Sequence, residues 1–535
     1  MSAHADEFAR EHLPPVSQWP LMDYSALPEL AYPETLNCAA ELVDRNVAKG
    51  HGSRVAIRFA GGQWTYERLL EQSSRLAYVL VRDFGVVPGT RVVLRGPNNP
   101  MMAAAWFAVL KAGAVCVTTM PLLRARELAF TVEKADIELA LCDARYLDDL
   151  VAAQQAAPRL ARVAAFGDVS QLDTLMRSAS TDFDNVPTGA DETAIIAFTS
   201  GTTGKAKGTM HFHRDILAIC DLFPRSCLQA SADDLFCGSP PLAFTFGLGG
   251  LLLFPLRIGA STLLLEQATP PNLIKAIQDH RATVCFTAPT AYRAMLGLIG
   301  QHDIASLRKC VSAGEHLPVA TFEAWKAATG ISIIDGIGST EMLHIFVSAP
   351  EDQIRPGATG KAVPGYEAKV VDDNGNELPV GSIGHIAVRG PTGCRYLDNE
   401  ERQLAYVKAG WNYPGDSFSM DADGYFWYQA RTDDMIISSG YNIAAAEIEG
   451  VLLEHDAVQE CGVVGLPDPE RGQRIKAFIV LRAGRTGSDE LVKELQDFVK
   501  RQIAPFKYPR VIEFVAAMPR TETGKLQRFR LREQG

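Results

Sequence analysis

Short apolar runs alternate with segments of helical spacing between about residue 50 and residue 430. The continuous apolar runs predict buried strands at 91–96, 137–143, 283–290 and 309–315. The segment 100–115 has the length and spacing of a helix that leads into the next strand. Strands that alternate with helices are typical of a layered α/β fold, in which ligands bind at the ends of the strands. We therefore expect a layered α/β domain over most of the chain.

The last hundred residues follow a different pattern. The predicted elements are a helix at 445–455, strands at 458–465 and 474–482, a helix with Leu491, Leu495 and Phe498 on one face, and a strand at 511–515. This order predicts a compact α+β module around a small sheet. A charged turn within 430–442 separates the two patterns, so we expect one domain over 1–432 and a second over 433–535.

One run, from Phe246 to Leu265, is apolar enough to raise the question of a membrane span. Pro255 and Arg257 interrupt it, and four glycines dilute it. A membrane-spanning helix needs about 20 consecutive, mostly apolar residues. The run therefore predicts a buried core element, and no membrane partner is expected.

Composition narrows the class of protein. The net charge of −11 over 535 residues argues against nucleic acid as the main partner. The ten cysteines are scattered and form no Cys-x-x-Cys pair, which favours a reduced, cytoplasmic location and no zinc site. The polar start of the chain is unlike a secretory signal. The sequence leaves open whether the protein is a monomer or a homodimer.

A loop with three glycines and two lysines, "TSGTTGKAKGT" at 199–209, follows the apolar run 194–198. Such backbones can bring several N–H groups to one phosphate. The loop is not a Walker A motif, because Thr199 stands where that motif needs glycine and Ala206 follows Lys205. Helical spacing from Ile216 onwards predicts that the loop joins a strand directly to a helix.

Four further motifs follow this loop in order. They are "DGIGSTEM" (335–342), "WNYPGD" (411–416), "ARTDDMIISSGYNIAAAEIE" (430–449) and "PRTETGKLQR" (519–528). The five motifs together resemble the core motifs of the adenylate-forming superfamily, which contains acyl- and aryl-CoA ligases, peptide-synthetase adenylation domains and firefly luciferase. The resemblance implies a large N-terminal layered α/β domain and a small, mobile C-terminal α+β domain.

The resemblance also implies that the chain activates a carboxylate with ATP and releases pyrophosphate. Lys525 matches the catalytic lysine, which would stabilise charge as the carboxylate approaches the α-phosphate. Thr340 and Glu341 match the pair at the catalytic centre, with Glu341 as the Mg²⁺ ligand. The residues that match ATP-binding positions are Thr199, Ser200, Gly201, Thr202, Thr203, Gly204, Lys205, Gly314, Glu315, Asp335, Gly336, Ile337, Asp416 and Arg431.

Some positions depart from the family pattern. Ile337 stands where many relatives place an aromatic residue that stacks on adenine, so adenine affinity would depend on apolar contact and on neighbouring polar groups. Ala206 replaces a proline, and Ala430 replaces a glycine. In "WNYPGD", the residues "YPGD" replace the commoner Thr-Gly-Asp. Neither this change nor Ala430 removes a key side chain: Asp416 and Arg431 still match the ribose-binding pair.

The second half-reaction would use a different orientation of the C-terminal module. Asp433 matches the hinge residue about which that module rotates after adenylate formation. Rotation would withdraw Lys525 and bring the segment with Ser439, Gly440 and Tyr441 to the site, where CoA binds in the family. The implied cofactors and co-substrates are ATP, Mg²⁺ and coenzyme A.

The residues expected to line the acid pocket are Phe244, Phe246, Tyr292, Ala313, Gly338 and His344. The stretch 335–346, together with "AFTFGLGG", most resembles benzoate and 2-aminobenzoate (anthranilate) CoA ligases. His344 would either face the ortho substituent of the acid or be a core histidine. The acceptor could be CoA or a carrier protein, and a non-catalytic nucleotide binder is the third alternative.

Overall fold

The computed structural model describes residues 2–167, 171–199, 206–431, 434–438, 441–468, 472–503, 507–521 and 525–534. One large sheet has, in spatial order, the strands β6 (Arg162–Phe166), β5 (Leu139–Asp143), β3 (Arg91–Arg95), β4 (Val115–Thr119), β7 (Thr193–Thr199) and β8 (Lys207–Phe212). The strands pair in parallel except at the β7–β8 edge, which is antiparallel.

The second large sheet is built around a parallel centre with antiparallel edges. Its strands, in spatial order, are β15 (Lys361–Ala362), β14 (Ile345–Ser348), β13 (Ile333–Gly338), β12 (Lys309–Ser312), β11 (Val284–Thr287), β9 (Leu235–Gly238), β10 (Ser261–Leu263), β1 (Val55–Phe59) and β2 (Gly62–Thr65). Its strands β12 and β13 lead into the segments that form the candidate site.

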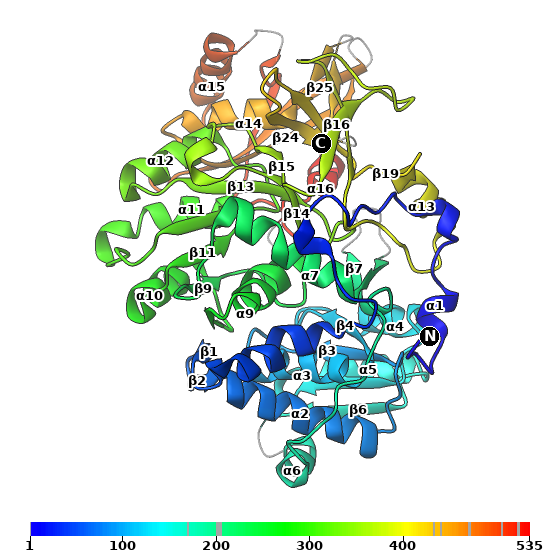
Figure 1. Cartoon of the computed structure of the whole chain (residues 1–535). Coiled ribbons are helices and arrows are strands. Elements are labelled where there is room, and N and C mark those ends of the chain that lie inside the picture. The colour runs from blue at the N-terminus through cyan, green and yellow to red at the C-terminus, as the bar shows by residue number, and fades with distance from the viewer. Residues whose placement is uncertain are drawn as a thin grey trace.

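Helices form three layers around these two sheets (Figure 1). The helices of the N-terminal part are α1 (Phe8–Glu11), α2 (Tyr66–Arg82), α3 (Pro100–Lys111), α4 (Ala125–Lys134), α5 (Leu147–Ala156), α6 (Gln171–Ser178), α7 (His213–Asp221), α8 (Thr245–Leu248), α9 (Phe254–Arg257), α10 (Pro270–His280), α11 (Pro289–Leu296), α12 (Val319–Thr329) and α13 (Glu400–Tyr406). Residues of α2, α3 and α7 share one buried cluster with strands of both sheets, so these helices lie between the sheets.

The outer faces of the two sheets are covered as well. In β3, Val92 packs into the inner cluster and Val93 packs outward against α4 and α5. In β11, Phe286 packs inward and Cys285 packs outward against α10, α11 and α12. Because both faces are buried, consecutive residues in the middle of these strands are apolar rather than alternating with polar ones, which is the pattern from which they were predicted.

Two smaller sheets complete the chain. The first contains β18 (Val407–Lys408), β19 (Trp411–Asn412), β17 (Ile383–Arg389), β20 (Asp416–Met420) and β21 (Phe426–Arg431), with β16 (Glu367–Val371) also paired to β17. The second contains β23 (Tyr441–Ile443), β22 (Ile436–Ser438), β25 (Gly472–Leu481), β24 (Val458–Asp468) and β26 (Val511–Phe514). The C-terminal helices are α14 (Ala445–Glu454), α15 (Asp489–Gln502) and α16 (Arg528–Glu533).

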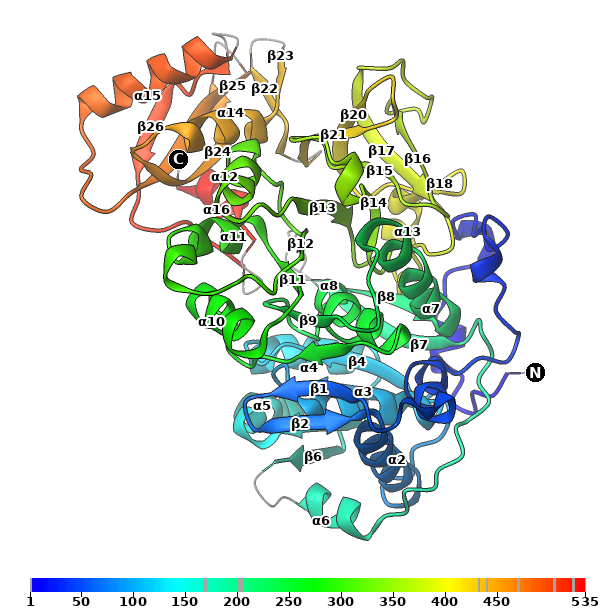
Figure 2. The same ribbon diagram turned by 60° about the vertical axis from the view of Figure 1, so that its left-hand side comes forward.

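The C-terminal elements gather at one end of the molecule, beside α11 and α12 (Figure 2). The predicted order of helix, two strands, helix and strand is confirmed by α14, β24, β25, α15 and β26. The sequence did not indicate β22 and β23 before this unit, or α16 after it. The predicted boundary between residues 432 and 433 lies outside the described residues and stays a prediction.

The apolar run 246–265 is confirmed as a buried element. It forms α8, a wider helical turn, α9 and β10, and Leu251, Leu252 and Phe254 are fully buried. Within the described part of the chain, no helix is both long and apolar enough to cross a membrane.

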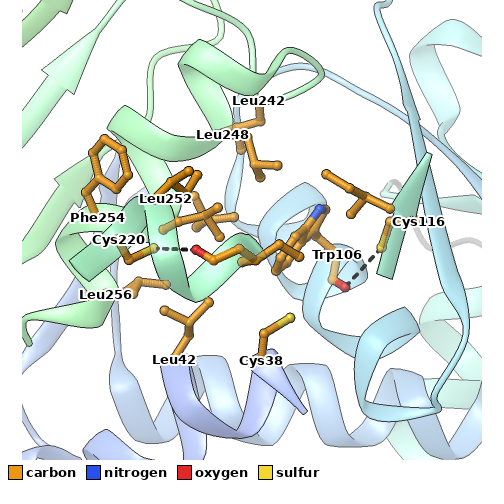
Figure 3. Packing of buried hydrophobic residues seen from close by; sticks show 14 of the residues in the cluster. Cys38, Leu42, Trp106, Cys116, Cys220, Leu242, Leu248, Leu252, Phe254 and Leu256 are labelled. Atoms are coloured by element: carbon orange, nitrogen blue, oxygen red, sulfur yellow. Dashed lines mark hydrogen bonds between the residues drawn. The ribbon is translucent and has the colours of Figure 1, made fainter. Parts of the chain in front are cut away.

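Cysteine side chains contribute to the same core (Figure 3). The Sγ of Cys220 donates to the carbonyl of Ile216 at 3.1 Å, and the Sγ of Cys116 donates to the carbonyl of Trp106 at 3.4 Å. Burial raises the pKa of the Cys116 and Cys220 thiols, so they stay protonated. These cysteines act as small apolar residues, as their sequence context indicates.

The structure corrects one prediction about the glycine-rich loop. The loop does not join a strand to a helix: it joins β7 to β8, which pair as an antiparallel hairpin from Thr199 opposite Lys207 to Thr193 opposite Phe212. Helix α7 starts only at His213, where the Asp215 carboxylate accepts a hydrogen bond from the N–H of Phe212. The helical spacing from Ile216 was correct, but it does not show where a helix begins. Residues 200–205 lie outside the described residues.

Candidate active site

The candidate site lies where β12 and β13 end. The turn after β12 contains Gly314, whose φ of +89° favours glycine. A Cβ atom added to Gly314 would lie 3.7 Å from the Cε of Lys525. The predicted catalytic lysine, which belongs to the C-terminal module, therefore reaches the end of a strand of the large N-terminal sheet.

Ion pairs support this placement of the C-terminal module. Arg520 lies 3.1 Å from Glu315 of the N-terminal part and 3.0 Å from Glu460 of the module. Burial raises the pKa of the Glu315 carboxyl, and the nearby cations Arg520 and Lys525 oppose the shift. From α11, Arg293 donates to the carbonyls of Leu453 and Val458 at 3.3 and 3.2 Å. These contacts join the two parts of the chain next to Lys525.

Asp416 and Arg431, the predicted ribose-binding pair, are brought together by the third sheet. Asp416 begins β20, Arg431 ends β21, and the two residues are directly opposite in the antiparallel register. Asp416 is mostly buried, with 7% of its surface exposed. The structure thus explains how two motifs separated in sequence can form one subsite.

The Asp335 carboxylate offers a hydrogen-bond acceptor that a nucleotide base could use. Its Oδ1 is buried and has no hydrogen-bond partner among the described residues. Burial raises the pKa of this carboxyl to about 7, against the opposing effects of the Ser312 hydroxyl and the Gly336 N–H. A buried acceptor without a donor costs about 1–3 kcal/mol. The exocyclic amino group of adenine is a donor that would remove this cost.

Glu341 lies in a turn that follows β13. Its Oε1 accepts a hydrogen bond from the hydroxyl of Tyr396 at 2.6 Å. No hydrogen bond to Oε2 occurs among the described residues. A carboxylate oxygen left for coordination fits the oxygen ligands that Mg²⁺ prefers, so Glu341 is suited to the metal role that the sequence suggests.

An aromatic cluster surrounds His344, which is 3% exposed. The His344 ring centroid lies 5.7 Å from Phe246, 4.5 Å from Phe254 and 5.9 Å from Phe223. Neither ring nitrogen of His344 has a hydrogen-bond partner in the described structure. Burial lowers the pKa of His344 to about 3 against the opposing effect of the nearby Phe246 backbone, so the ring is neutral near pH 7.

Glycines of the "FGLGG" stretch allow the close packing of this cluster. A Cβ atom on Gly249 would lie 2.4 Å from the Cδ2 of His344, and one on Gly250 would lie 2.5 Å from the Cδ1 of Phe286. Phe244 and Phe246 are half-buried at the start of α8. Ala313 is buried at the end of β12, and Gly338 is exposed at the end of β13. Of these predicted pocket residues, Ala313 belongs to the buried cluster on the inner face of the sheet, and Phe246 packs against it.

Tyr292 is a correction to the predicted pocket. It is fully buried on the outer side of the sheet, with its ring 4.8 Å from Trp325. Its hydroxyl donates to the carbonyls of Cys285 and Val311 at 2.8 and 3.1 Å. The sheet separates this cluster from Phe246 and His344, so Tyr292 is a packing residue. The sequence could not show on which side of the sheet α11 lies.

The remaining predicted residues have different outcomes. Gly336, Ile337 and Thr340 lie in or just after β13, beside Asp335 and Glu341. Thr199 ends β7 at the rim of the glycine-rich loop. The positions outside the described residues are Ser200, Gly201, Thr202, Thr203, Gly204, Lys205, Asp433, Ser439 and Gly440. Tyr441 begins β23, and its side chain is not described.

Two residues at the site were missed by sequence reasoning. Tyr396 contacts Glu341 across 55 residues, and the Nε2 of His211 donates to the carbonyl of Thr340 across 129 residues. No periodicity or motif in a single sequence connects positions so far apart. Only the pairing of distant segments in the fold brings them together.

Comparison with known proteins agrees with this geometry. Residues 44–395 match the AMP-binding enzyme family, and residues 447–525 match the AMP-binding enzyme C-terminal domain. Benzoate–CoA ligase of Thauera aromatica is 33% identical over 512 residues, which cover 94% of this chain and 97% of the relative. 3-Hydroxybenzoate–CoA ligase of Aromatoleum sp. (strain CIB) is 31% identical over 507 residues, which cover 93% and 97%.

Solved structures show the same similarity. The crystal structure of the anthranilate CoA ligase AuaEII in complex with anthranoyl-AMP superimposes with a TM-score of 0.91 at 34% identity, covering 95% of this chain and 99% of that one. A benzoate CoA ligase from Burkholderia xenovorans LB400 superimposes with a TM-score of 0.86 at 32% identity, covering 93% and 100%.

A large α/β domain joined to a small lysine-bearing module is the architecture of an enzyme that forms acyl adenylates. This chain belongs to the AMP-binding enzyme family, within its AMP-forming acid–CoA ligases. The predicted resemblance to the adenylate-forming superfamily and the predicted fold class are confirmed.

Proposed function

We propose that this enzyme activates a small planar aryl acid with ATP and then transfers the aryl group to coenzyme A. 2-Aminobenzoate is the favoured substrate, and benzoate is the second. The observation that carries this assignment is the aromatic cluster around His344, in which both ring nitrogens lack partners. The names of the relatives, which include benzoate and anthranilate CoA ligases, support the same substrate class.

In the first step, a carboxylate oxygen of the acid attacks the α-phosphorus of ATP, the bond to the β,γ-phosphates breaks, and pyrophosphate leaves. The Lys525 ammonium would stabilise the negative charge that gathers as the two anions meet. Mg²⁺ held by Glu341 would supply positive charge to the leaving phosphates. Asp416 and Arg431 would hold the ribose, and Asp335 would accept from the adenine amino group.

In the second step, the sulfur of CoA attacks the acyl carbon, and AMP leaves with the electrons of the broken acyl–oxygen bond. This step needs a path for the thiol where Lys525 now lies. Rotation about Asp433 would open that path and bring the segment 438–442 to the site. The segment would then line the CoA channel.

An ortho amino group gives the proposal a specific contact. Its N–H would donate to a nitrogen of neutral His344, which accepts no hydrogen bond in the described structure. With benzoate the acceptor nitrogen of His344 would stay unpaired, and an unpaired buried polar group costs about 1–3 kcal/mol, which corresponds to roughly tenfold to hundredfold discrimination in kcat/KM. Benzoate lacks the amine and fills the same aromatic cluster, so it should react as the poorer substrate.

The test of this function is pyrophosphate release measured with 2-aminobenzoate, benzoate, 4-hydroxycinnamate and a long-chain fatty acid, each with and without CoA. We expect the first two acids to give the highest kcat/KM and CoA to give a thioester. A preference for either of the last two acids would contradict the pocket assignment. Adenylate formation without thioester would favour a carrier protein as acceptor, and no pyrophosphate from any acid would favour a nucleotide binder.

Replacing His344 by Ala should reduce the ratio of kcat/KM for 2-aminobenzoate to that for benzoate about tenfold or more, because the acceptor of the ortho amine is removed. His344→Phe is the matched variant, since it keeps a ring against Phe254 but has no nitrogen. Both variants should reduce the ratio. An unchanged ratio in both would assign His344 to the core, and a reduced ratio in the Ala variant alone would indicate a cavity effect.

A further inference from the structure

The segment that contains Tyr396 lies along β8, the strand that leaves the glycine-rich loop. The N–H of Met210 donates to the carbonyl of Arg395 at 2.8 Å, and the N–H of Leu397 donates to the carbonyl of Gly208 at 2.9 Å. This pairing sets Tyr396 opposite Thr209. The backbone of Tyr396 is therefore fixed to the same strand that anchors the loop.

Several buried contacts hold Tyr396 in one orientation. Its N–H donates to the Oε1 of Gln403 at 2.9 Å, and Gln403 is itself fully buried. Its ring packs edge-on against Tyr406 with 5.9 Å between centroids. The preceding residue, Arg395, forms a buried ion pair with Asp215 at 2.8 Å. Tyr396 is 2% exposed, so its side chain has little freedom to turn.

The hydroxyl of Tyr396 is aimed at Glu341. It donates to the Oε1 of Glu341 at 2.6 Å, a distance typical of a bond to a charged acceptor. Tyr396 therefore occupies one carboxylate oxygen of Glu341 and leaves the other.

The backbone around Glu341 is held from β8 as well. The Nε2 of His211 donates to the carbonyl of Thr340 at 2.8 Å. The hydroxyls of Ser339 and Tyr406 lie 3.1 Å apart, and the Ser339 hydroxyl also accepts from the N–H of Met342 at 3.1 Å. His211 therefore connects the turn that contains Glu341 to the β7–β8 hairpin. Tyr406 connects the same turn to Tyr396.

We propose that Tyr396 is a positioning residue, which fixes the Glu341 carboxylate relative to β8 so that its second oxygen is presented to the divalent cation of bound ATP. The inference rests on the proposed role of Glu341 as the metal ligand. A hydrogen bond to the carboxylate oxygen that does not bind the metal orients the ligand side chain. The side chain then need not be ordered each time the metal binds. Loss of such a partner lowers metal affinity or activity by about 10–100-fold.

The experiment measures ATP binding to the full chain by calorimetry, without acid or CoA, once with Mg²⁺ and once with EDTA. The quantity of interest is the ratio of the Kd in EDTA to the Kd in Mg²⁺. Tyr396→Phe should lower this ratio about tenfold or more while leaving the Kd in EDTA unchanged. Tyr66→Phe is the matched control, because Tyr66 is also buried and loses one bond, to the carbonyl of Ala260 at 2.6 Å. That control should keep the wild-type ratio.

Glu341→Gln separates this inference from the proposed function. It should bring the ratio close to one, and adding Tyr396→Phe to it should change nothing further, because the two residues act as one unit. If Glu341→Gln lowers the ratio and Tyr396→Phe does not, the positioning role is wrong and the metal role stands. If Glu341→Gln keeps the ratio, both assignments are wrong.

Folding of the variants is checked by near-UV circular dichroism and by Tm. Phe keeps the ring of Tyr396 and its contact with Tyr406, so we expect a folded protein. If the Phe variant does not fold, Glu341→Asp decides the question, because it keeps the charge but withdraws the carboxylate from the Tyr396 hydroxyl. A wild-type ratio in that variant would overturn the proposal.

Discussion

Replacing Lys525 by Ala should lower the rate of adenylate formation about 100-fold to 1,000-fold, the usual effect of removing one pre-positioned charge donor at a reacting centre. The lysine reaches the turn after β12, next to Gly314 and Glu315. In the proposed reaction, Lys525 would meet both the carboxylate and the α-phosphate. The measurement is exchange of labelled pyrophosphate into ATP with saturating 2-aminobenzoate.

The reaction of preformed aryl-adenylate with CoA should survive in the same variant, because the proposed rotation would withdraw Lys525 in that step. Lys493→Ala is the matched control, since Lys493 is an exposed lysine on α15 of the same module. An adenylation rate equal to that of the wild type would show that the role given to Lys525 is wrong. An equal loss in both half-reactions would indicate a general defect of the module.

The second large effect is expected at the proposed hinge. Asp433→Pro fixes φ near −65° and restricts the residue before it, so the rotation of the module should be blocked. We expect pyrophosphate release to persist and thioester formation to fall about 100-fold or more, the scale of loss when a reacting group is misplaced. Single-turnover formation of adenylate and of thioester would be measured separately.

The observed contacts explain the direction of this effect. Arg520 bridges Glu315 and Glu460, and Arg293 holds the carbonyls of Leu453 and Val458, so the described orientation is the one that presents Lys525. Asp433→Ala is the control, because it removes the same carboxylate but leaves φ free. If the Ala variant loses as much thioester as the Pro variant, the carboxylate rather than the backbone rotation is responsible.

Strand positions in the parallel sheets were predictable because burial on both faces leaves continuous apolar runs. The runs predicted at 91–96, 137–143, 283–290 and 309–315 contain β3, β5, β11 and β12. The order of helices and strands in the C-terminal module could also be predicted, since their apolar residues recur with clear helical or strand spacing. The β7–β8 hairpin around the glycine-rich loop could not be predicted in this way, because β8 is a short strand that is followed directly by α7.

The sequence by itself determined the chemistry that this protein carries. Lys525, Glu341, Asp416 and Arg431 were all predicted from ordered motifs, because each motif is a local stretch with its own residue types and spacing. Only the tertiary structure decided which side chains support them and which face of a sheet each occupies. Tyr396 reaches Glu341 through the pairing of its segment with β8, and Tyr292 is separated from His344 by a sheet. Contacts of this kind depend on the pairing of distant segments, which leaves no periodic signal in a single chain.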